Sequence, residues 1–328
     1  MAVIALVIAF ALEQFRPLPA RSALNAFVEA LAAGAERRLN AGQPRHGRLA
    51  WWLLVGAAAL ATFAIHEVLL LGLGWWAALP FSVLVLYLSA GFRKFSHPYK
   101  EIQLAVERGD VDGARRALTA WKRAEQPEYD GTALADDELI RQTLAHGLLQ
   151  TQRHVFGVLF WYALLAWAVG PAGAVVYGLA MALAWYWNRP TADTAGLPPD
   201  RFGEYAATAA AWIDFIPARL AALGFAIVGD FEGAAYCWRR AAALATPVAG
   251  RPALDAPTLL LAAASGALGT RVVDAQQASR FFAEPGNEGA GLTDPAPRTL
   301  AAGAAMMWRA VVLWLGLLAL LTAVAWAP

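Results

Sequence analysis

Eight ionisable side chains are the first candidates for chemistry in this sequence, because together they could hold an anion. Five are lysine or arginine, two are histidine and one is aspartate, so positive charge is in excess. Such an excess attracts a phosphate or a carboxylate, and arginine can hold either group through two parallel hydrogen bonds. The predicted ligand site consists of Arg93, Lys94, His97, Arg153, His154, Asp214, Arg219 and Arg271. We expect these groups to converge, with no catalytic residue and no metal ligand among them.

Each part of this set also has an explanation that involves no ligand. The basic and aromatic run 91–101 follows a long apolar stretch, where it would anchor a helix end in the headgroup region of a membrane. Arg153 and His154 precede another apolar stretch and could act in the same way. Asp214 and Arg219 could instead satisfy backbone groups that a proline kink sets free. Both explanations stay open at these positions.

The sequence lacks the motifs that would indicate several other functions. The sequence contains no G-x-x-x-x-G-K-[ST] phosphate loop, no H-E-x-x-H and no G-x-S-x-G. Its single cysteine, Cys237, excludes an internal disulfide and every metal site built from several cysteines. A net charge of +1 gives no electrostatic reason to expect nucleic acid as a partner.

The elements that must position these residues are membrane helices. Hydrophobic residues make up 59% of the 328 residues and charged residues 16%, whereas soluble domains have about 45–50% and about 25%. A spanning helix needs roughly 20 apolar residues. Six stretches qualify or nearly do, at about 1–15, 49–71, 75–91, 155–169, 172–187 and 308–326. We therefore predict an all-α, polytopic integral membrane bundle with cytoplasmic helical insertions, forming a single domain over 1–328.

The basic residues predict its orientation. No Lys or Arg lies between 49 and 92, between 155 and 188, or after Arg309. The positive-inside rule then places the segments 13–48, 92–154 and 188–307 in the cytoplasm. We expect an integral protein of the bacterial inner (cytoplasmic) membrane, with the lipid bilayer and an anionic small molecule at the cytoplasmic face as its partners.

The cytoplasmic segments themselves contain helix signals. We expect Asp110 to cap a helix that begins at 111, and a further helix over 136–152 with acidic residues in its first turn. The apolar segment 205–229 has charged residues near its middle, and each would cost roughly 2.5–3.5 kcal/mol at the bilayer centre. We expect it to be a re-entrant or interfacial helix that is kinked at Pro217 rather than a further span.

Five sequence blocks resemble the CobD/CbiB family of cobalamin biosynthesis, in the order in which that family has them. The blocks are GDVDGARRAL at 109–118, FGVLFW at 156–161, GPAGAVVY at 170–177, WIDFIPARL at 212–220 and GALGTRV at 266–272. The resemblance covers about residues 90–310. It implies a polytopic membrane protein, and the family's synthases join an aminopropanol unit to a corrinoid carboxylate with ATP.

The chain departs from those synthases where they are acidic. Their E-S-x-A-E-N-x-S-D-G block corresponds to 143–154, which has no Glu, Asn or Asp; their N-T-x-D-S-M block corresponds to 181–188; and their paired aspartates correspond to the alanines at 209–211. Mg²⁺ prefers carboxylate oxygens. The loss resembles the AmpE branch, a membrane protein linked to control of β-lactamase induction.

Two functions therefore remain in view. The first is a non-catalytic, AmpE-like sensor or signalling modulator that uses no cofactor. The alternative is an ATP-dependent adenosylcobinamide-phosphate synthase, which would need ATP and Mg²⁺. A cluster of carboxylates facing a cytoplasmic pocket would favour the enzyme, whereas a basic and aromatic pocket would favour the sensor.

Overall fold

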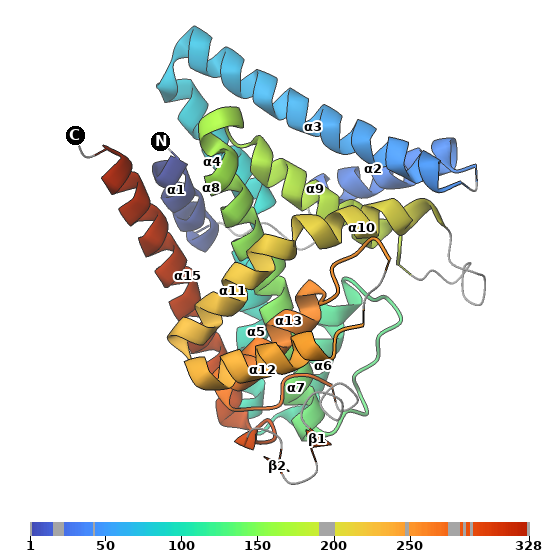
Figure 1. The fold of residues 1–328 in the computed structure, drawn as a ribbon, viewed down its shortest axis with the longest axis vertical. Coiled ribbons are helices and arrows are strands. Elements are labelled where there is room, and N and C mark those ends of the chain that lie inside the picture. Colours follow the sequence, from blue (N-terminus) through green and yellow to red (C-terminus); the bar gives the residue numbers. More distant parts are fainter. Residues whose placement is uncertain are drawn as a thin grey trace. The chain divides into compact units, whose positions relative to one another are not determined.

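Helices account for nearly all of the regular structure, as the apolar stretches of the sequence predict. The computed structural model describes residues 2–15, 23–41, 43–189, 201–246, 249–274, 283–284, 287–288 and 291–326. The first half of the chain contains α1 (Ala2–Phe15), α2 (Ala23–Leu39), α3 (Pro44–Leu73), α4 (Trp75–Ser89), α5 (Phe92–Glu107), α6 (Val111–Arg123), α7 (Asp136–Thr151), the π-helix η1 (Gln152–Phe156) and α8 (Gly157–Val169). The second half contains α9 (Ala172–Tyr186), the 3₁₀ turn η3 (Arg201–Gly203), α10 (Glu204–Ile213), α11 (Phe215–Val228), α12 (Phe231–Ala243), α13 (Ala256–Leu268) and α15 (Pro297–Trp326). Two antiparallel strands of two residues, β1 (Ala283–Glu284) and β2 (Asn287–Glu288), complete the described elements, so the all-α class is confirmed (Figure 1).

Among the described residues, two helices are long and apolar enough to cross a membrane by length and composition. They are Pro44–Leu73 in α3 and Pro297–Val324 in α15, each with a mean hydropathy of 2.0. The pair Arg201–Ile213 and Phe215–Val228 makes a third if it is counted as one bent span. Large apolar side chains lie on the surface, among them Leu71 at 82% exposure and Trp167 at 86%. These features belong to a membrane protein, because water would not tolerate so much exposed apolar surface.

The remaining predicted spans coincide with shorter helices. α1, α4, α8 and α9 have 13 to 15 residues each. At 1.5 Å per residue such a helix covers roughly 20–23 Å, less than the roughly 30 Å of hydrocarbon. The number of spans therefore stays a prediction, while the positions of the helices agree closely with it.

The chain folds into two compact units. Unit 1 consists of Met1–Arg93 and Arg153–Asp214, and unit 2 of Lys94–Gln152 and Phe215–Pro328. This division does not test the prediction of one membrane domain over 1–328, which stays a prediction.

Unit 1 is built around α3 and α9. α3 packs against α4 and α9, α8 pairs with α9, and α1, α2 and α10 cover this group. One of its core clusters includes Trp51, Leu183, Trp187 and Phe202. The backbone of Phe202 approaches Gly47 closely in this cluster, because a Cβ at position 47 would lie 1.9 Å from the carbonyl oxygen of Phe202.

Unit 2 contains the polar helices and α15. α12 packs against α13, and α11 packs against both of them and against α15. Ile102, Leu118 and Leu139 form the core between α5, α6 and α7. Asp110 caps α6 by accepting a hydrogen bond from the Gly113 N–H at 2.8 Å, which confirms the predicted cap.

The expected kink at Pro217 is wrong by three residues. α10 ends at Ile213 and α11 begins at Phe215, so the break lies at Asp214. Pro217 sits in the first turn of α11, where its missing N–H costs no helical hydrogen bond. Whether 205–229 spans the membrane or re-enters it stays a prediction.

Candidate functional site

A buried acid and a buried phenol form the polar centre of unit 1. The hydroxyl of Tyr177, on α9, donates a hydrogen bond of 2.9 Å to Oδ1 of Asp214, at the end of α10. Tyr177 is fully buried and Asp214 is 6% exposed. Ionisable groups inside a membrane bundle are rare and usually functional or paired. Asp214 has such a partner, which satisfies part of its need for hydrogen bonds.

Two further contacts hold this pair in place. The indole N–H of Trp161, on α8, donates to the carbonyl oxygen of Ile213 at 3.0 Å, next to the helix break. Gly157, also on α8, leaves room for the phenol, since a Cβ there would lie 2.0 Å from Cζ of Tyr177. Residues of α8 and α9 therefore position Asp214.

Arg153 and His154 lie in the π-helix η1, a conformation that occurs often at functional sites. The charge of Arg153 acts on the phenol of Tyr177. Of the eight predicted ligand residues, Asp214 is hydrogen-bonded to this tyrosine, and Arg153 is near enough for its charge to act on it. His154 instead lines a small apolar crevice with side chains of α1, α4 and α8.

Tyr177 was not predicted to belong to the site. It stands in the resembling block at 170–177, and a hydroxyl within an apolar helix was the available signal. Its partner lies 37 residues along the chain, which no local pattern reveals.

The predicted residues of unit 2 have separate partners. Arg219 stacks on the ring of its own helix neighbour Phe215, 3.4 Å from the centroid, and donates to the carbonyl oxygens of Phe215 and Leu254 at 3.0 and 3.5 Å. Within the described residues it has no carboxylate partner. Arg271 is paired with Asp294 at 3.3 Å.

The three remaining members of the predicted ligand set belong to α5. His97 is exposed on α5, and the side chains of Arg93 and Lys94 lie outside the described part of the structure. The eight residues are divided between the two units, so their convergence on one ligand stays a prediction.

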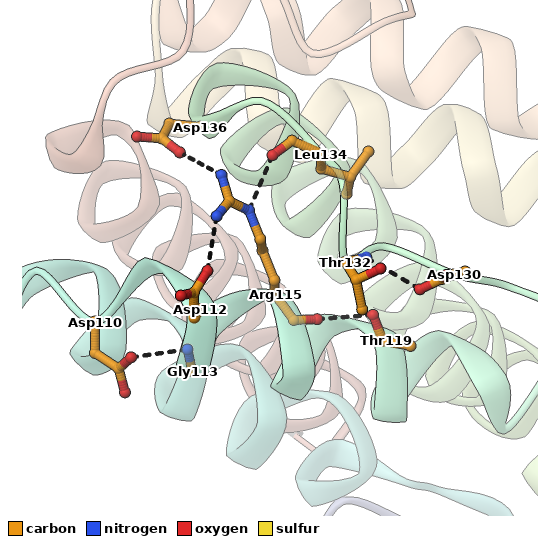
Figure 2. A network of polar contacts seen from close by, with 9 residues as sticks. All are labelled: Asp110, Asp112, Gly113, Arg115, Thr119, Asp130, Thr132, Leu134 and Asp136. Carbon is orange, nitrogen blue, oxygen red and sulfur yellow. Dashed lines mark hydrogen bonds and ion pairs between the residues drawn. The ribbon is translucent and has the colours of Figure 1, made fainter.

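A polar network around Arg115 includes residues of the block at 109–118 that resembles the CobD/CbiB family (Figure 2). Its guanidinium donates to Asp112, to Asp136 and to the carbonyl oxygen of Leu134, each at 2.9 Å. The backbone carbonyl of Arg115 accepts a hydrogen bond from Thr119 Oγ1 at 2.8 Å. This block therefore ties α6 to the start of α7, a structural role that the sequence did not reveal.

A second network joins α6 to α7 next to it. Gln142 accepts hydrogen bonds from Lys122 Nζ at 2.8 Å and from the Tyr129 hydroxyl, and it donates to Glu138 at 2.6 Å. Arg141 grips Glu138 through two nitrogens. Lys122 lies 4.0 Å from the centre of the Tyr129 ring.

Burial changes the acid–base properties of this network. It lowers the pKa of Lys122, and the nearby Arg141 lowers it further. Burial also raises the pKa of Tyr129 to about 12, with a contribution from the charge of Glu138. For Glu138 burial acts to raise the pKa, but hydrogen bonds from Arg141 and Gln142 outweigh it, so the pKa lies below its ordinary value.

Three carboxylates of α6 and α7 are held by arginines and do not form a magnesium–nucleotide site. Arg115 engages Asp112 and Asp136, and Arg141 engages Glu138. Among the described residues no three His, Cys, Asp or Glu side chains are grouped so that they could hold a metal ion. The carboxylate cluster that would have favoured the enzyme is thus not found in the part of the chain that the structure describes.

Comparison with known proteins decides the family. The family described as CobD/Cbib protein matches residues 5–277. The chain belongs to the CobD/CbiB family. A protein of Stutzerimonas stutzeri named cobalamin biosynthesis protein CobD is 30% identical over 247 residues, 73% of this chain and 71% of that protein. A protein of the same name from Chromobacterium violaceum is 30% identical over 227 residues, 68% of this chain and 63% of that protein.

The CobD/CbiB match extends the resemblance toward the amino terminus. It begins at residue 5, so it takes in α1, α2 and the α3–α4 hairpin as well as the five quoted blocks. No solved structure matches the chain. Both of these relatives carry the CobD name, and neither is named after AmpE.

Proposed function

We propose that this chain acts in cobalamin biosynthesis as a membrane-bound synthase of the adenosylcobinamide-phosphate type. The family match over residues 5–277 and two relatives named cobalamin biosynthesis protein CobD support this role. The reaction that the family implies joins an amine to a corrinoid carboxylate and draws on ATP.

The polar centre of unit 1 supplies groups that such a reaction can use. A carboxylate that is 6% exposed and a fully buried phenol are joined by a hydrogen bond of 2.9 Å. In this proposal the carboxylate of Asp214 orients the amine substrate, and Arg153 attracts the anionic end of a substrate. The pair's burial excludes water and so strengthens both interactions.

A specific observation favours a second candidate, a non-catalytic member of the AmpE kind. The positions where the synthases are acidic carry Thr143 to His154, Met181 to Asn188 and three alanines at 209–211. The carboxylates of unit 2 that could replace them are engaged by Arg115 and Arg141. Because these carboxylates already have arginine partners, they offer magnesium no open ligand set.

We also infer the location of the polar segments. The basic residues are confined to 13–48, 92–154 and 188–309, which supports a cytoplasmic location for these segments and a bacterial inner membrane as the site of insertion. Soluble cosubstrates such as ATP would then reach the polar segments directly.

A growth test separates the two candidates. The gene is expressed in a strain that lacks the synthase and must make cobalamin to grow, and immunoblotting of membranes shows that the protein is present. Restored growth supports the synthase. If the inserted protein does not restore growth, the non-catalytic candidate replaces it. Asp214→Asn should abolish any rescue, whereas Tyr205→Phe, a change at a half-buried tyrosine of the same unit, should not.

A further inference from the structure

Four arginines gather where α2 ends and α3 begins. Arg37, Arg38, Arg45 and Arg48 are all exposed, and none of them forms an ion pair within the described residues. The segment 37–48 contains no acidic residue. With Glu36 as the acidic residue next to them, the four arginines give unit 1 an excess of positive charge in this short stretch.

α2 itself carries an exposed apolar stripe. Leu24, Phe27 and Leu31 are 37%, 59% and 39% exposed, and their spacing of three and four places them on one face of the helix. Arg38 follows Leu31 by seven residues and so continues the same face. The stripe thus ends in a positive charge, the pattern of a helix that lies in a membrane interface.

The opposite flank of α2 packs on the membrane helices of unit 1. Ala32, Ala35 and Leu39 join a core cluster with Trp51 and Trp187. The indole N–H of Trp187 donates to the carbonyl oxygen of Ala32 at 3.1 Å. The exposed stripe is therefore held in a fixed place beside α3 and α9.

A second contact fixes the level of α2 along α9. Arg189 pairs with Glu29 of α2 at 2.8 Å and stacks on Trp185 and Tyr186, 4.9 and 5.1 Å from their ring centres. Tryptophan and tyrosine at the end of a span occupy the headgroup layer. α2 lies at the same level.

The neighbouring surface of α3 supports this placement. Leu49, Trp52 and Leu53 are 52%, 58% and 54% exposed at the start of its apolar stretch. α2 packs against α3 in Figure 1 and in the structure's contacts. α2 and the start of α3 thus both expose apolar side chains, and the four arginines stand at the end of α2 and the start of α3.

We propose that α2 lies in the headgroup layer and that Arg37, Arg38, Arg45 and Arg48 bind the phosphate groups of anionic phospholipids. Basic clusters next to a membrane helix gain roughly a fivefold increase in binding to an anionic surface for each arginine. This inference does not depend on the proposed reaction. It names phospholipid of the surrounding leaflet as the occupant of this surface.

The test compares two variants of the full chain, in each of which four arginines are replaced by glutamine. The first replaces Arg37, Arg38, Arg45 and Arg48 with glutamine. The control replaces four other exposed arginines of unit 2 that have no ion pair within the described residues, namely Arg108, Arg116, Arg239 and Arg251. Each protein is reconstituted in bilayers of phosphatidylcholine with or without phosphatidylglycerol, and lipids retained after delipidation are counted by native mass spectrometry.

We expect the wild type and the control variant to retain phosphatidylglycerol over phosphatidylcholine. In the first variant the preference for phosphatidylglycerol over phosphatidylcholine should fall at least tenfold, while circular dichroism shows that its helices are intact. Equal preference in all three proteins would overturn the proposal, as would an equal loss in the control. Inorganic phosphate should not displace the retained lipid, and displacement would show an adventitious anion site instead.

A depth measurement gives an independent result. Phe27→Cys, in a chain with Cys237→Ser, carries a nitroxide spin label whose accessibility to oxygen and to an aqueous nickel complex is compared. A higher accessibility to oxygen supports burial in lipid. A label that the nickel complex reaches more readily than oxygen would refute it.

Discussion

The close approach of α12 and α13 makes Gly266→Ala a sharp test of unit 2. A Cβ at position 266 would lie 2.1 Å from the carbonyl oxygen of Gly233 and 2.5 Å from the amide nitrogen of Ala234. These are backbone atoms, so the added methyl group must push one helix away by about 1 Å to reach an ordinary contact. Overpacking of this kind costs roughly 1–3 kcal/mol. We expect a loss of about 2 kcal/mol in the stability of this helix pair, which is about a 30-fold increase in its opening.

Cys237 reports this opening directly, because it lies on α12 and is fully buried. Burial raises the pKa of its thiol from an ordinary 9.0 to about 11, so little thiolate exists near neutral pH. Alkylation by a maleimide in detergent at constant pH should therefore be slow in the wild type and about 30-fold faster in Gly266→Ala. Gly316→Ala is the matched control, since nothing lies within 4 Å of its Cβ. Equal alkylation rates in all three proteins would refute the packing that we describe.

Three further predictions concern other parts of the chain. Tyr177→Phe removes the hydroxyl that donates to Asp214, and it should lower the free energy of unfolding by roughly 1–3 kcal/mol in tryptophan-detected melting. The control Tyr205→Phe should change it little, because the Tyr205 hydroxyl has no hydrogen bond within the described residues. Equal melting of the two variants would contradict the role of the Tyr177–Asp214 pair. Glu138→Gln should destabilise the protein by up to about 1 kcal/mol above pH 4.5, because the carboxylate stabilises the fold only while it is ionised. The loss should shrink as the pH falls through the lowered pKa of this carboxylate. A melting difference that grows in acid would contradict this sign. Leu73→Cys, with the native cysteine replaced by serine, should be labelled from outside intact cells, and labelling from the cytoplasm alone would reverse the topology.

The sequence predicts the helices of this chain well because apolar runs and caps are local signals. The predicted span at 172–187 and the observed helix Ala172–Tyr186 differ by one residue. Asp110 caps α6 as expected, since an N-cap needs only the three residues that follow it. The start of α3 at Pro44 instead of 49 shows the limit of hydropathy, because a helix can begin in a polar segment, here with proline at its first position.

The candidate site was harder to predict because its contacts join distant residues. Tyr177 meets Asp214, and Arg115 meets Asp136, over 37 and 21 residues of sequence. A single sequence contains no signal for either pair. The helix break at Asp214 was placed at Pro217 because proline usually disrupts a helix, yet in the first turn it does not.

An assay of amide formation tests the proposed synthase most directly. The purified chain in detergent receives an adenosylated corrinoid acid, aminopropanol phosphate, ATP and Mg²⁺, and the product is identified by mass spectrometry. We expect a corrinoid amide that forms only when ATP is present and that is lost in Asp214→Asn. A chain that remains folded and monodisperse but forms no amide would contradict the synthase role and identify a non-catalytic member of the CobD/CbiB family.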